Sequence, residues 1–336
     1  MITELTEYAR EHWAGWFGSS PEEISIALGS GGPAHRTRAA VFLFEGRRRR
    51  PSVVMKIAFT ELESSFLRHE HDALTRVRPL LPGAMPSSVP PALGLAVIEG
   101  NTVLSMGAVA GRRLLVPNLG GSGGRLARSL LSDFFRKSFD WSKKLAQATR
   151  SPILLDGSHL AEIVDRFASL PLDSPGLDER LPGFRRAVEE SGIQWSTSWQ
   201  HADLAVGNVL IHRGELRLLD WEHADQQSQP WFDIAQSPGA TARLAKRQSG
   251  LGSSRAAALA ALGGSGWAGE VLRAEMEGTW DHPLPMGWAI ALSSMATAIR
   301  QSDDARMGAE DWMELSAALI ADDELRAALP WMVPDW

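Results

Sequence analysis

Residues 199–236 read WQHADLAVGNVLIHRGELRLLDWEHADQQSQPWFDIAQ, and this stretch decides how the chain is interpreted. Its apolar segments NVLIH and LRLLDW flank the turn RGE, a pattern that is typical of a β-hairpin. A hairpin brings its two outer ends together, so we expect Asn208 and Asp220 side by side at one end. Asp203 lies on the loop that precedes the hairpin.

These three polar residues predict a metal site that works with a phosphate-bearing substrate. Carboxylate and amide oxygens are hard ligands that suit Mg²⁺. A cage built only from protein would need more carboxylates than Asp203, Asn208 and Asp220 provide. Mg²⁺ commonly keeps waters and takes further ligands from nucleotide phosphates.

Composition limits the class of protein. The chain has 336 residues, of which 44% are hydrophobic and 22% charged, as in ordinary globular proteins, and its length suits two lobes or domains. A formal charge of −6 argues against a general nucleic-acid binder. The absence of cysteine excludes disulfides, thiolate zinc sites and cysteine nucleophiles. With no signal-like N-terminus, we expect a cytoplasmic protein that does not enter membranes.

The two parts of the chain on either side of Gly111 differ in their patterns. Before it, five strand-like segments accompany helical periodicity at residues 1–20 and 61–81, and acidic and basic residues balance. The whole formal charge of −6 therefore lies after Gly111. There the sequence is mainly helical in pattern, at about 125–149, 158–170, 178–191, 252–262, 267–277, 284–300 and 309–329. Residues 284–299 are predicted to form a buried helix and not a membrane span.

The polar residues of the opening stretch resemble those of the aminoglycoside phosphotransferase and choline kinase-like family, whose members phosphorylate small molecules. The resemblance rests on His201-x-Asp203-x4-Asn208, on DWE at 220–222 and on WFDIA at 231–235. It extends to the N-terminal part, where Lys56 in VVMK matches the strand lysine of the family. Glu70 in LRHEHDAL matches its helix partner, and SMGAVAGRRL resembles the hinge between lobes.

The resemblance implies a two-lobed, protein-kinase-like α+β fold with an N-terminal five-stranded antiparallel sheet plus helix and a mainly helical C-terminal lobe. Residues 1–106 would form the nucleotide-clamping lobe, 107–111 the hinge and 112–336 the catalytic and acceptor-binding lobe. The implied reaction is ATP- and Mg²⁺-dependent transfer of a γ-phosphoryl group to a small-molecule hydroxyl. GTP stays open as the nucleotide. An antibiotic, sugar, nucleoside or amino alcohol stays open as the acceptor, and a monomer or homodimer as the working state.

The family pattern also implies roles for the matching residues. Asp203 would orient the acceptor hydroxyl or accept its proton, while Asn208 and Asp220 would hold Mg²⁺. Lys56 would pair with the nucleotide phosphates, and Glu70 would hold Lys56 by an ion pair. Each residue also has an ordinary structural alternative. Asp203 could cap a loop, and Asn208 and Asp220 could form turns. Lys56 could be an edge-strand charge, and Glu70 could lie on a solvated helix face.

Further residues complete the predicted site. His201 would brace the catalytic loop and Asp233 would anchor it. Glu222 would either face the acceptor or satisfy a backbone group. The nucleotide would contact Val54, Gly29 and Gly31 of the turn LGSGGPAHR, and Met106.

Two features depart from the family pattern. Ala205 and Val206 stand where the family usually has a second His and a Pro, and the Gly-rich turn is irregular and is not a Walker loop. Neither departure removes a predicted ligand or base.

Two other functions stay open at this point. The chain could be a non-catalytic nucleotide-binding scaffold of the same fold. It could also be a metal-dependent phosphohydrolase with His201, His212, His223 and Asp220 as ligands.

Overall fold

The computed structural model describes residues 1–29, 37–113, 125–172, 174–263, 266, 268–304 and 309–333. The chain forms two compact units. The first contains Met1–Arg113 and Asn208–Ala224, and the second contains Leu114–Gly207 and Asp225–Trp336. The lobe limits 1–106, 107–111 and 112–336 stay a prediction.

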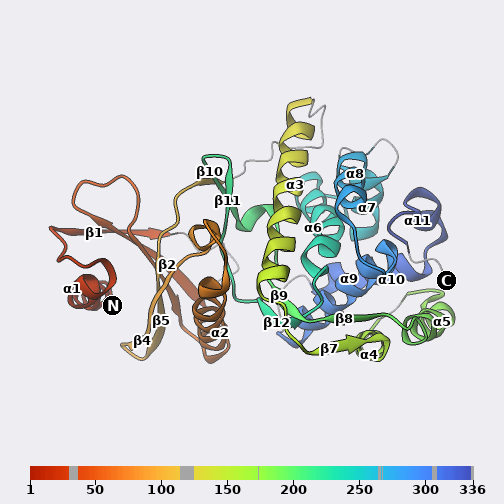
Figure 1. Cartoon of the computed structure of the whole chain (residues 1–336), viewed down its shortest axis with the longest axis horizontal. Coiled ribbons are helices and arrows are strands. Elements are labelled where there is room, and N and C mark those ends of the chain that lie inside the picture. Colours follow the sequence, from red (N-terminus) through yellow and green to blue (C-terminus); the bar gives the residue numbers. More distant parts are fainter. Residues whose placement is uncertain are drawn as a thin grey trace. The chain divides into compact units, whose positions relative to one another are not determined.

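A five-stranded antiparallel sheet of order β1-β2-β3-β5-β4 forms the body of the first unit (Figure 1), as predicted for an α+β protein. Its strands are β1 (Ile24–Gly29), β2 (Arg38–Glu45), β3 (Val53–Ala58), β4 (Ala92–Ile98) and β5 (Asn101–Gly107). Its helices are α1 (Ile2–Phe17) and α2 (Glu61–Val77), with 3₁₀ turns at Arg78–Leu80 and Met85–Ser88. A three-stranded sheet contains β6 (Arg112–Arg113), β10 (Val209–His212) and β11 (Glu215–Leu218).

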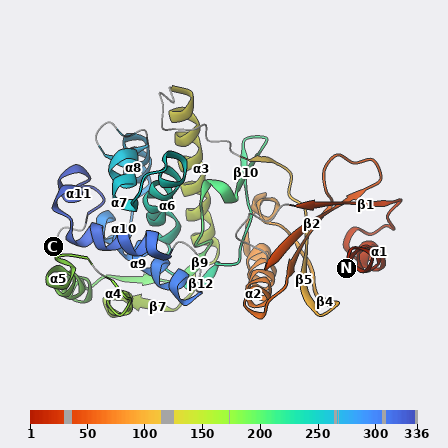
Figure 2. The same ribbon diagram turned by 180° about the vertical axis from the view of Figure 1, so that it is seen from behind.

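Each face of the five-stranded sheet is covered by one helix (Figure 1, Figure 2). Met55 and Ile57 of β3 are buried in one core cluster with Leu5 and Trp13 of α1. Because side chains alternate along a strand, Lys56 points to the opposite face. That is the face on which α2 packs, so the strand register places the lysine next to α2.

Helix α2 begins and ends on clear local signals. The Oγ1 of Thr60 accepts a hydrogen bond from the N–H of Glu63 at 3.3 Å, which caps the first turn. Glu61 and Glu63 lie in that turn, where negative charge interacts favourably with the helix dipole. Pro79 lies in the following 3₁₀ turn, so the helix predicted over 61–81 ends at Val77.

The hairpin of β10 and β11 is confirmed. Its turn residues Arg213 and Gly214 have φ values of 52° and 82°, the pattern of a type I′ turn. The twist of such a turn matches the twist of the flanking strands and fixes their register. Val209 accordingly pairs with Leu218, next to the open end of the hairpin.

The second unit is mainly helical. Its helices are α3 (Arg125–Ala148), α4 (Gly157–Ala168), α5 (Leu177–Glu189), α6 (Phe232–Ser249), α7 (Ser254–Leu262), α8 (Gly269–Thr279), α9 (Met286–Asp303), α10 (Ala309–Ala321) and α11 (Asp323–Ala328). A 3₁₀ turn spans Val206–Asn208. Two small antiparallel pairs join β7 (Leu154–Asp156) to β8 (Gln194–Ser196), and β9 (Ser198–Gln200) to β12 (Asp225–Ser228).

Helix α9 is the buried helix that the sequence predicts. It packs against α4, α6 and α10, and Trp288, Leu292, Met295 and Ile299 are all buried. Among the described residues, none of the helices combines the length and the apolar character that crossing a membrane requires.

Helix α6 corrects the sequence analysis, which predicts no helix over 232–249. Pro238 and Gly239 interrupt the expected periodicity there, yet both lie inside the helix. Gly239 is needed for packing, because a Cβ atom at this position would lie 2.1 Å from Cζ3 of Trp312. Trp312 belongs to α10 and is only 2% exposed, so the two helices approach closely at this glycine.

We predict that Gly239→Ala lowers the free energy of unfolding by about 1–3 kcal/mol, because the added methyl group overpacks the contact with Trp312. The control is Gly278→Ala in α8, where a Cβ atom would meet nothing within 4 Å. This change should leave stability unchanged or raise it by up to about 1 kcal/mol. Urea unfolding followed by circular dichroism measures both. Equal stabilities of the two variants would contradict the close helix contact.

Candidate active site

The ammonium group of Lys56 contacts two carboxylates within the first unit. Its Nζ donates to both side-chain oxygens of Glu70, at 2.8 and 2.7 Å, and to Oδ1 of Asp220. The side chain of Glu70 is 1% exposed and that of Asp220 is 40% exposed. Burial acts to lower the pKa of Lys56, but the charges of Asp220, Glu70 and Glu222 outweigh it and raise this pKa above its ordinary value. The lysine is therefore charged at neutral pH.

The carboxylate of Glu70 also holds the segment that follows β11. Its Oε1 accepts a hydrogen bond from the backbone N–H of Trp221 at 3.2 Å. Trp221 is fully buried, and its indole N–H donates to the carbonyl of Leu218 at 3.3 Å. Asp220 directly precedes it, with a φ of 63°, in the left-handed region that non-glycine residues seldom adopt. One buried carboxylate thus joins β3, α2 and the end of the hairpin.

Two side chains outside the predicted set, those of Arg38 and His69, hold residues 222–224 in place. Arg38, the first residue of β2, donates from Nη1 to Glu222 at 2.5 Å and from Nε to Glu63 of α2 at 2.6 Å. A ring nitrogen of His69, also on α2, lies 2.7 Å from the carbonyl oxygen of Ala224. The side chain of Glu222 is only 8% exposed. Helix α2 therefore fixes this segment at several points.

The open end of the hairpin offers hard oxygen ligands. The N–H of Leu219 donates to the carbonyl of Asn208 at 2.9 Å, so Asn208 lies beside the residue that precedes Asp220. Carboxylate oxygens of Glu70, Asp220 and Glu222 lie within 4.8 Å of one another, and Asp220 is the most exposed of the three. Mg²⁺ prefers such donors, so Asp220 and the side-chain oxygen of Asn208 fit this metal.

Three of the residues predicted to contact the nucleotide share one region of the five-stranded sheet. Val54 and Met106 are direct partners on β3 and β5. Val54 lies two residues before Lys56 and so belongs to the same face of the sheet. Gly29 ends β1 and stands in the same row of the sheet as Lys56, two strands away. Gly31 lies outside the described residues.

In the second unit, Asp233 at the start of α6 holds residues 201–203. Its two carboxylate oxygens accept hydrogen bonds from the backbone N–H groups of His201, at 2.9 Å, and Ala202, at 2.7 Å. The Nδ1 of His201 accepts from the N–H of Asp203 at 3.3 Å, which places the ring proton on Nε2. Burial raises the pKa of Asp233, while His201 and the two N–H groups act in the opposite direction. The backbone before Asp203 is thus fixed by buried polar side chains.

The metal-ligand cluster among the described residues does not include the histidines of the phosphohydrolase alternative. The ring of His223 packs edge-on against Phe66, with 6.1 Å between ring centroids. Among the described residues, the group of ligand atoms that lie close enough to share a metal contains carboxylates and no histidine. The structure therefore disfavours this alternative.

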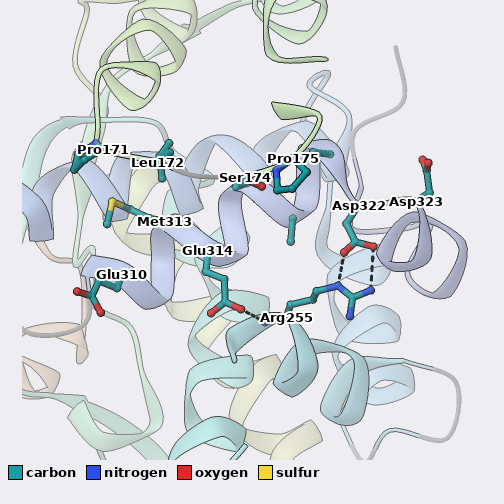
Figure 3. A pocket seen from close by; sticks show the side chains of 13 residues that line it. Pro171, Leu172, Ser174, Pro175, Arg255, Glu310, Met313, Glu314, Asp322 and Asp323 are labelled. Carbon is teal, nitrogen blue, oxygen red and sulfur yellow. Dashed lines mark hydrogen bonds and ion pairs between the residues drawn. The ribbon is translucent and has the colours of Figure 1, made fainter. Parts of the chain in front are cut away.

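A cavity of about 560 Å³ lies in the second unit between α10 and the segment that precedes α5 (Figure 3). Several of its charged residues have structural partners. Arg255 of α7 pairs with Asp322, and a carboxylate oxygen of Glu314 accepts from the N–H of Ser254 at 2.8 Å. These contacts join α7, α10 and the start of α11. None of the predicted site residues lines this cavity.

We predict that Lys56→Met lowers the free energy of unfolding by about 3 kcal/mol, because it leaves Glu70 charged and buried without its cation. Adding Glu70→Gln to this variant should recover part of the loss, since it removes the orphaned charge. Urea unfolding of the two single variants and the double variant tests this.

The matched control is Lys144→Met, which removes an exposed ion pair with Asp140 on α3 and should change stability little. A double variant that loses the sum of the two single losses would show that Lys56 and Glu70 do not stabilise each other.

Comparison with known proteins gives the same picture of the fold. The sequence pattern of the phosphotransferase enzyme family (APH) matches residues 33–269. No curated protein matches the chain significantly. A candidate aminoglycoside phosphotransferase from Ralstonia eutropha JMP134 superposes with a TM-score of 0.57 at 16% identity, covering 94% of this chain and 97% of the other.

Two further solved structures resemble the chain at low sequence identity. One is a thermostable mutant of the aminoglycoside phosphotransferase APH(4)-Ia in a ternary complex with ADP and hygromycin B. Its TM-score is 0.52 at 14% identity, with 93% of this chain and 97% of the other covered. The other is a choline/ethanolamine kinase family protein from Mesorhizobium loti. Its TM-score is 0.51 at 12% identity, with 97% and 96% covered.

These likenesses confirm the predicted kinase-like α+β fold. The family pattern spans most of the chain, which confirms the resemblance and the predicted class of enzyme, a small-molecule kinase. The chain belongs to the phosphotransferase enzyme family.

Proposed function

We propose that the chain transfers the γ-phosphoryl group of ATP to a hydroxyl group of a small molecule in a Mg²⁺-dependent reaction. The observation that carries this proposal is the position of Lys56, whose Nζ contacts the buried Glu70 and the more exposed Asp220. Glu70 keeps the lysine charged and oriented. A phosphate oxygen could replace the more exposed Asp220 as a partner of the ammonium group. A lysine held in this way is suited to pair with nucleotide phosphates.

Asp220 and Asn208 would hold the Mg²⁺ ion. Their place at one end of the hairpin, together with the partial exposure of Asp220, supports this assignment. When bound there, the ion would supply positive charge that offsets the negative charge of the phosphates. Val54, Met106, Gly29 and Gly31 are proposed to contact the nucleotide.

Asp203 would position the acceptor hydroxyl and accept its proton. The hydroxyl oxygen then bonds to the γ-phosphorus as the bond to the β-phosphate oxygen breaks, which releases ADP. The fixed backbone supports this role, because the N–H of Asp203 donates to His201 and its carbonyl accepts from Ala205 at 2.8 Å. A rigidly held carboxylate keeps the acceptor hydroxyl at a fixed position and orientation for reaction. In this proposal His201 braces the loop and Asp233 anchors it.

The choice of nucleotide and acceptor belongs to the proposal. APH(4)-Ia, which shares the fold, forms a complex with ADP and hygromycin B, which supports an adenine nucleotide and a small-molecule acceptor. GTP is the alternative nucleotide, and the acceptor is an antibiotic, sugar, nucleoside or amino alcohol. Glu222 forms an ion pair with Arg38. This pair supports a structural role for Glu222 and not a contact between Glu222 and the acceptor. We place the reaction in the cytoplasm, with a monomer or homodimer as the working state.

The alternative is a non-catalytic scaffold of the same fold. A scaffold that only binds nucleotide has no need of a proton acceptor. Here Lys56, Asp203, Asn208 and Asp220 are all present, which supports catalysis. Incubation with ATP, Mg²⁺ and a panel of hydroxyl compounds separates the two. Mass spectrometry should find one added phosphate on at least one compound, and a scaffold would add none.

We predict that Asp203→Asn lowers kcat by about 10²–10⁴-fold and leaves nucleotide affinity nearly unchanged, because the amide cannot accept the hydroxyl proton. Steady-state kinetics and calorimetric titration with Mg²⁺ and ATP measure the two effects. The control is Asp225→Asn, because Asp225 is exposed and lies in the same unit as Asp203. This variant should keep the wild-type kcat. Turnover of Asp203→Asn near the wild-type rate would contradict the proposed mechanism.

We predict that Asp220→Ala raises the Mg²⁺ concentration needed for half-maximal activity by at least about tenfold, because it removes a metal ligand. Asp220 also contacts Lys56, so Lys56→Met is the matched comparison. That variant should lose affinity for ATP at every Mg²⁺ concentration without a comparable shift in the Mg²⁺ requirement. If the two variants respond to Mg²⁺ alike, Asp220 acts through the lysine and is not a ligand.

A further inference from the structure

The carbonyl group of Ala202, directly before Asp203, accepts hydrogen bonds from two side chains. The Nη2 of Arg300 on α9 donates to it at 2.7 Å, and the Nε2 of Gln236 on α6 donates at 3.2 Å. Gln236 is held in turn, because its Nε2 also lies 3.0 Å from Oγ1 of Thr297 on α9. Two helices that are distant in sequence therefore converge on one backbone oxygen.

This oxygen belongs to the peptide group that leads into Asp203. The N–H of the same peptide group is that of Asp203 and donates to Nδ1 of His201, so both polar atoms of the group are held by side chains. Ala202 has a φ of 60°, a left-handed conformation that costs a non-glycine residue about 1–2 kcal/mol. Such a conformation persists only where the surroundings hold it. Arg300 is one of the groups that do so.

A charged, half-buried arginine is a costly way to satisfy a carbonyl. The guanidinium of Arg300 lies over the ring of Phe232, with 5.9 Å from Cζ to the ring centroid. Burial lowers the pKa of Arg300, while the charges of Asp203, Asp304 and other carboxylates act in the opposite direction. A neutral donor such as glutamine could make the same hydrogen bond without burying a charge. What the arginine adds is a rigid, charge-assisted hydrogen bond beside Asp203.

We propose that Arg300 is a positioning residue, which sets the orientation of Asp203 by holding the carbonyl of Ala202. This inference rests on the proposed role of Asp203 in accepting the hydroxyl proton. It assigns to Arg300 no contact with the substrate and no proton transfer. Its effect should therefore fall on kcat and leave KM for ATP unchanged.

The test uses ADP formation from Mg²⁺ and ATP with water as the acceptor hydroxyl, and any acceptor found by mass spectrometry as a second assay. Arg300→Ala should lower kcat by about 10- to 100-fold, because small misplacements of a reacting group have effects of this size. KM for ATP should stay within about twofold. Added guanidinium ion should restore part of kcat, since it can fill the vacated space and donate to Ala202. Arg300→Lys, which keeps a charged donor, should lose less than Arg300→Ala.

The matched control is Arg166→Ala. Arg166 on α4 pairs with Asp303 at 2.7 Å, at the same end of α9 as Arg300, but its side chain is 63% exposed. The Arg166→Ala variant should leave kcat unchanged. An unchanged kcat would show that the loss in Arg300→Ala comes from the contact with Ala202 and not from a general disturbance of α9. In an Asp203→Asn background, Arg300→Ala should cause little further loss, because Arg300 acts through Asp203. Thermal unfolding shows whether each variant is folded. If Arg300→Ala does not fold, Arg300→Lys is the deciding variant and should lower kcat at an unchanged Tm.

Several outcomes would overturn the inference. One is an additive loss in the double variant with Asp203→Asn, and another is a rise in KM for ATP as large as the fall in kcat. Wild-type kcat in both Arg300→Ala and Arg300→Lys would overturn it as well. Failure of the proposed function looks different. In that case the wild-type protein forms no ADP and phosphorylates no acceptor, whereas here the wild-type protein is active and Asp203→Asn has a much lower kcat.

Discussion

The contact between the ammonium of Lys56 and the carboxylate of Glu70 is the interaction on which the first unit depends. Neither charge is stable in that position alone, because burying an uncompensated ion costs several kcal/mol. The lysine requires β3 to present its even-numbered residues to α2, and the glutamate requires α2 to turn its buried face toward the sheet. Glu70 then accepts the N–H of Trp221, so the segment after β11 is placed by the same carboxylate. One buried ion pair therefore links the register of a strand, the rotation of a helix and the path of a loop.

In the second unit, the buried carboxylate of Asp233 holds a loop in a similar way. The charge of Asp233 is compensated by the backbone N–H groups of residues 201 and 202 and by the nearby Arg300. In both units a residue with a left-handed backbone conformation adjoins these contacts: Asp220 has a φ of 63° and Ala202 a φ of 60°. Charge-assisted hydrogen bonds are short and directional, so they can hold a strained loop in one geometry. Apolar packing, which has no preferred direction, would hold it less tightly.

Local patterns were enough to predict much of the fold. The alternation of the strands, the capped start of α2 and the turn between β10 and β11 are all encoded within a few residues. Asn208 and Asp220 could be placed together from that turn alone, whereas Lys56 and Glu70 were found through the family resemblance. Helix α6 was missed because Pro238 and Gly239 interrupt its pattern, and the fit of Trp312 against Gly239 is visible only in three dimensions.

The residues that sequence reasoning missed have partners far away in the chain. Arg38 bonds to Glu222 across 184 positions, and Arg300 bonds to Ala202 across 98. No local pattern marks either arginine, and each could equally well lie on a solvated surface. Glu63 carried a weak signal, because it lies seven residues before Glu70 and so on the same face of α2. The roles of the site residues and the lobe limits remain predictions, since geometry alone shows contacts and not chemistry.

The balance of charge around Lys56 bears on how a nucleotide would bind. Four carboxylates contact two cations in this cluster, which leaves an excess of two negative charges: Glu63, Glu70, Asp220 and Glu222 against Lys56 and Arg38. A free polyphosphate would be repelled by that excess even though Lys56 attracts it. A divalent cation carries the charge that cancels the excess, and the most exposed carboxylate of the cluster, Asp220, is the one best placed to meet it. For the proposed reaction, this charge balance would favour a nucleotide that binds together with Mg²⁺ over a nucleotide that binds alone.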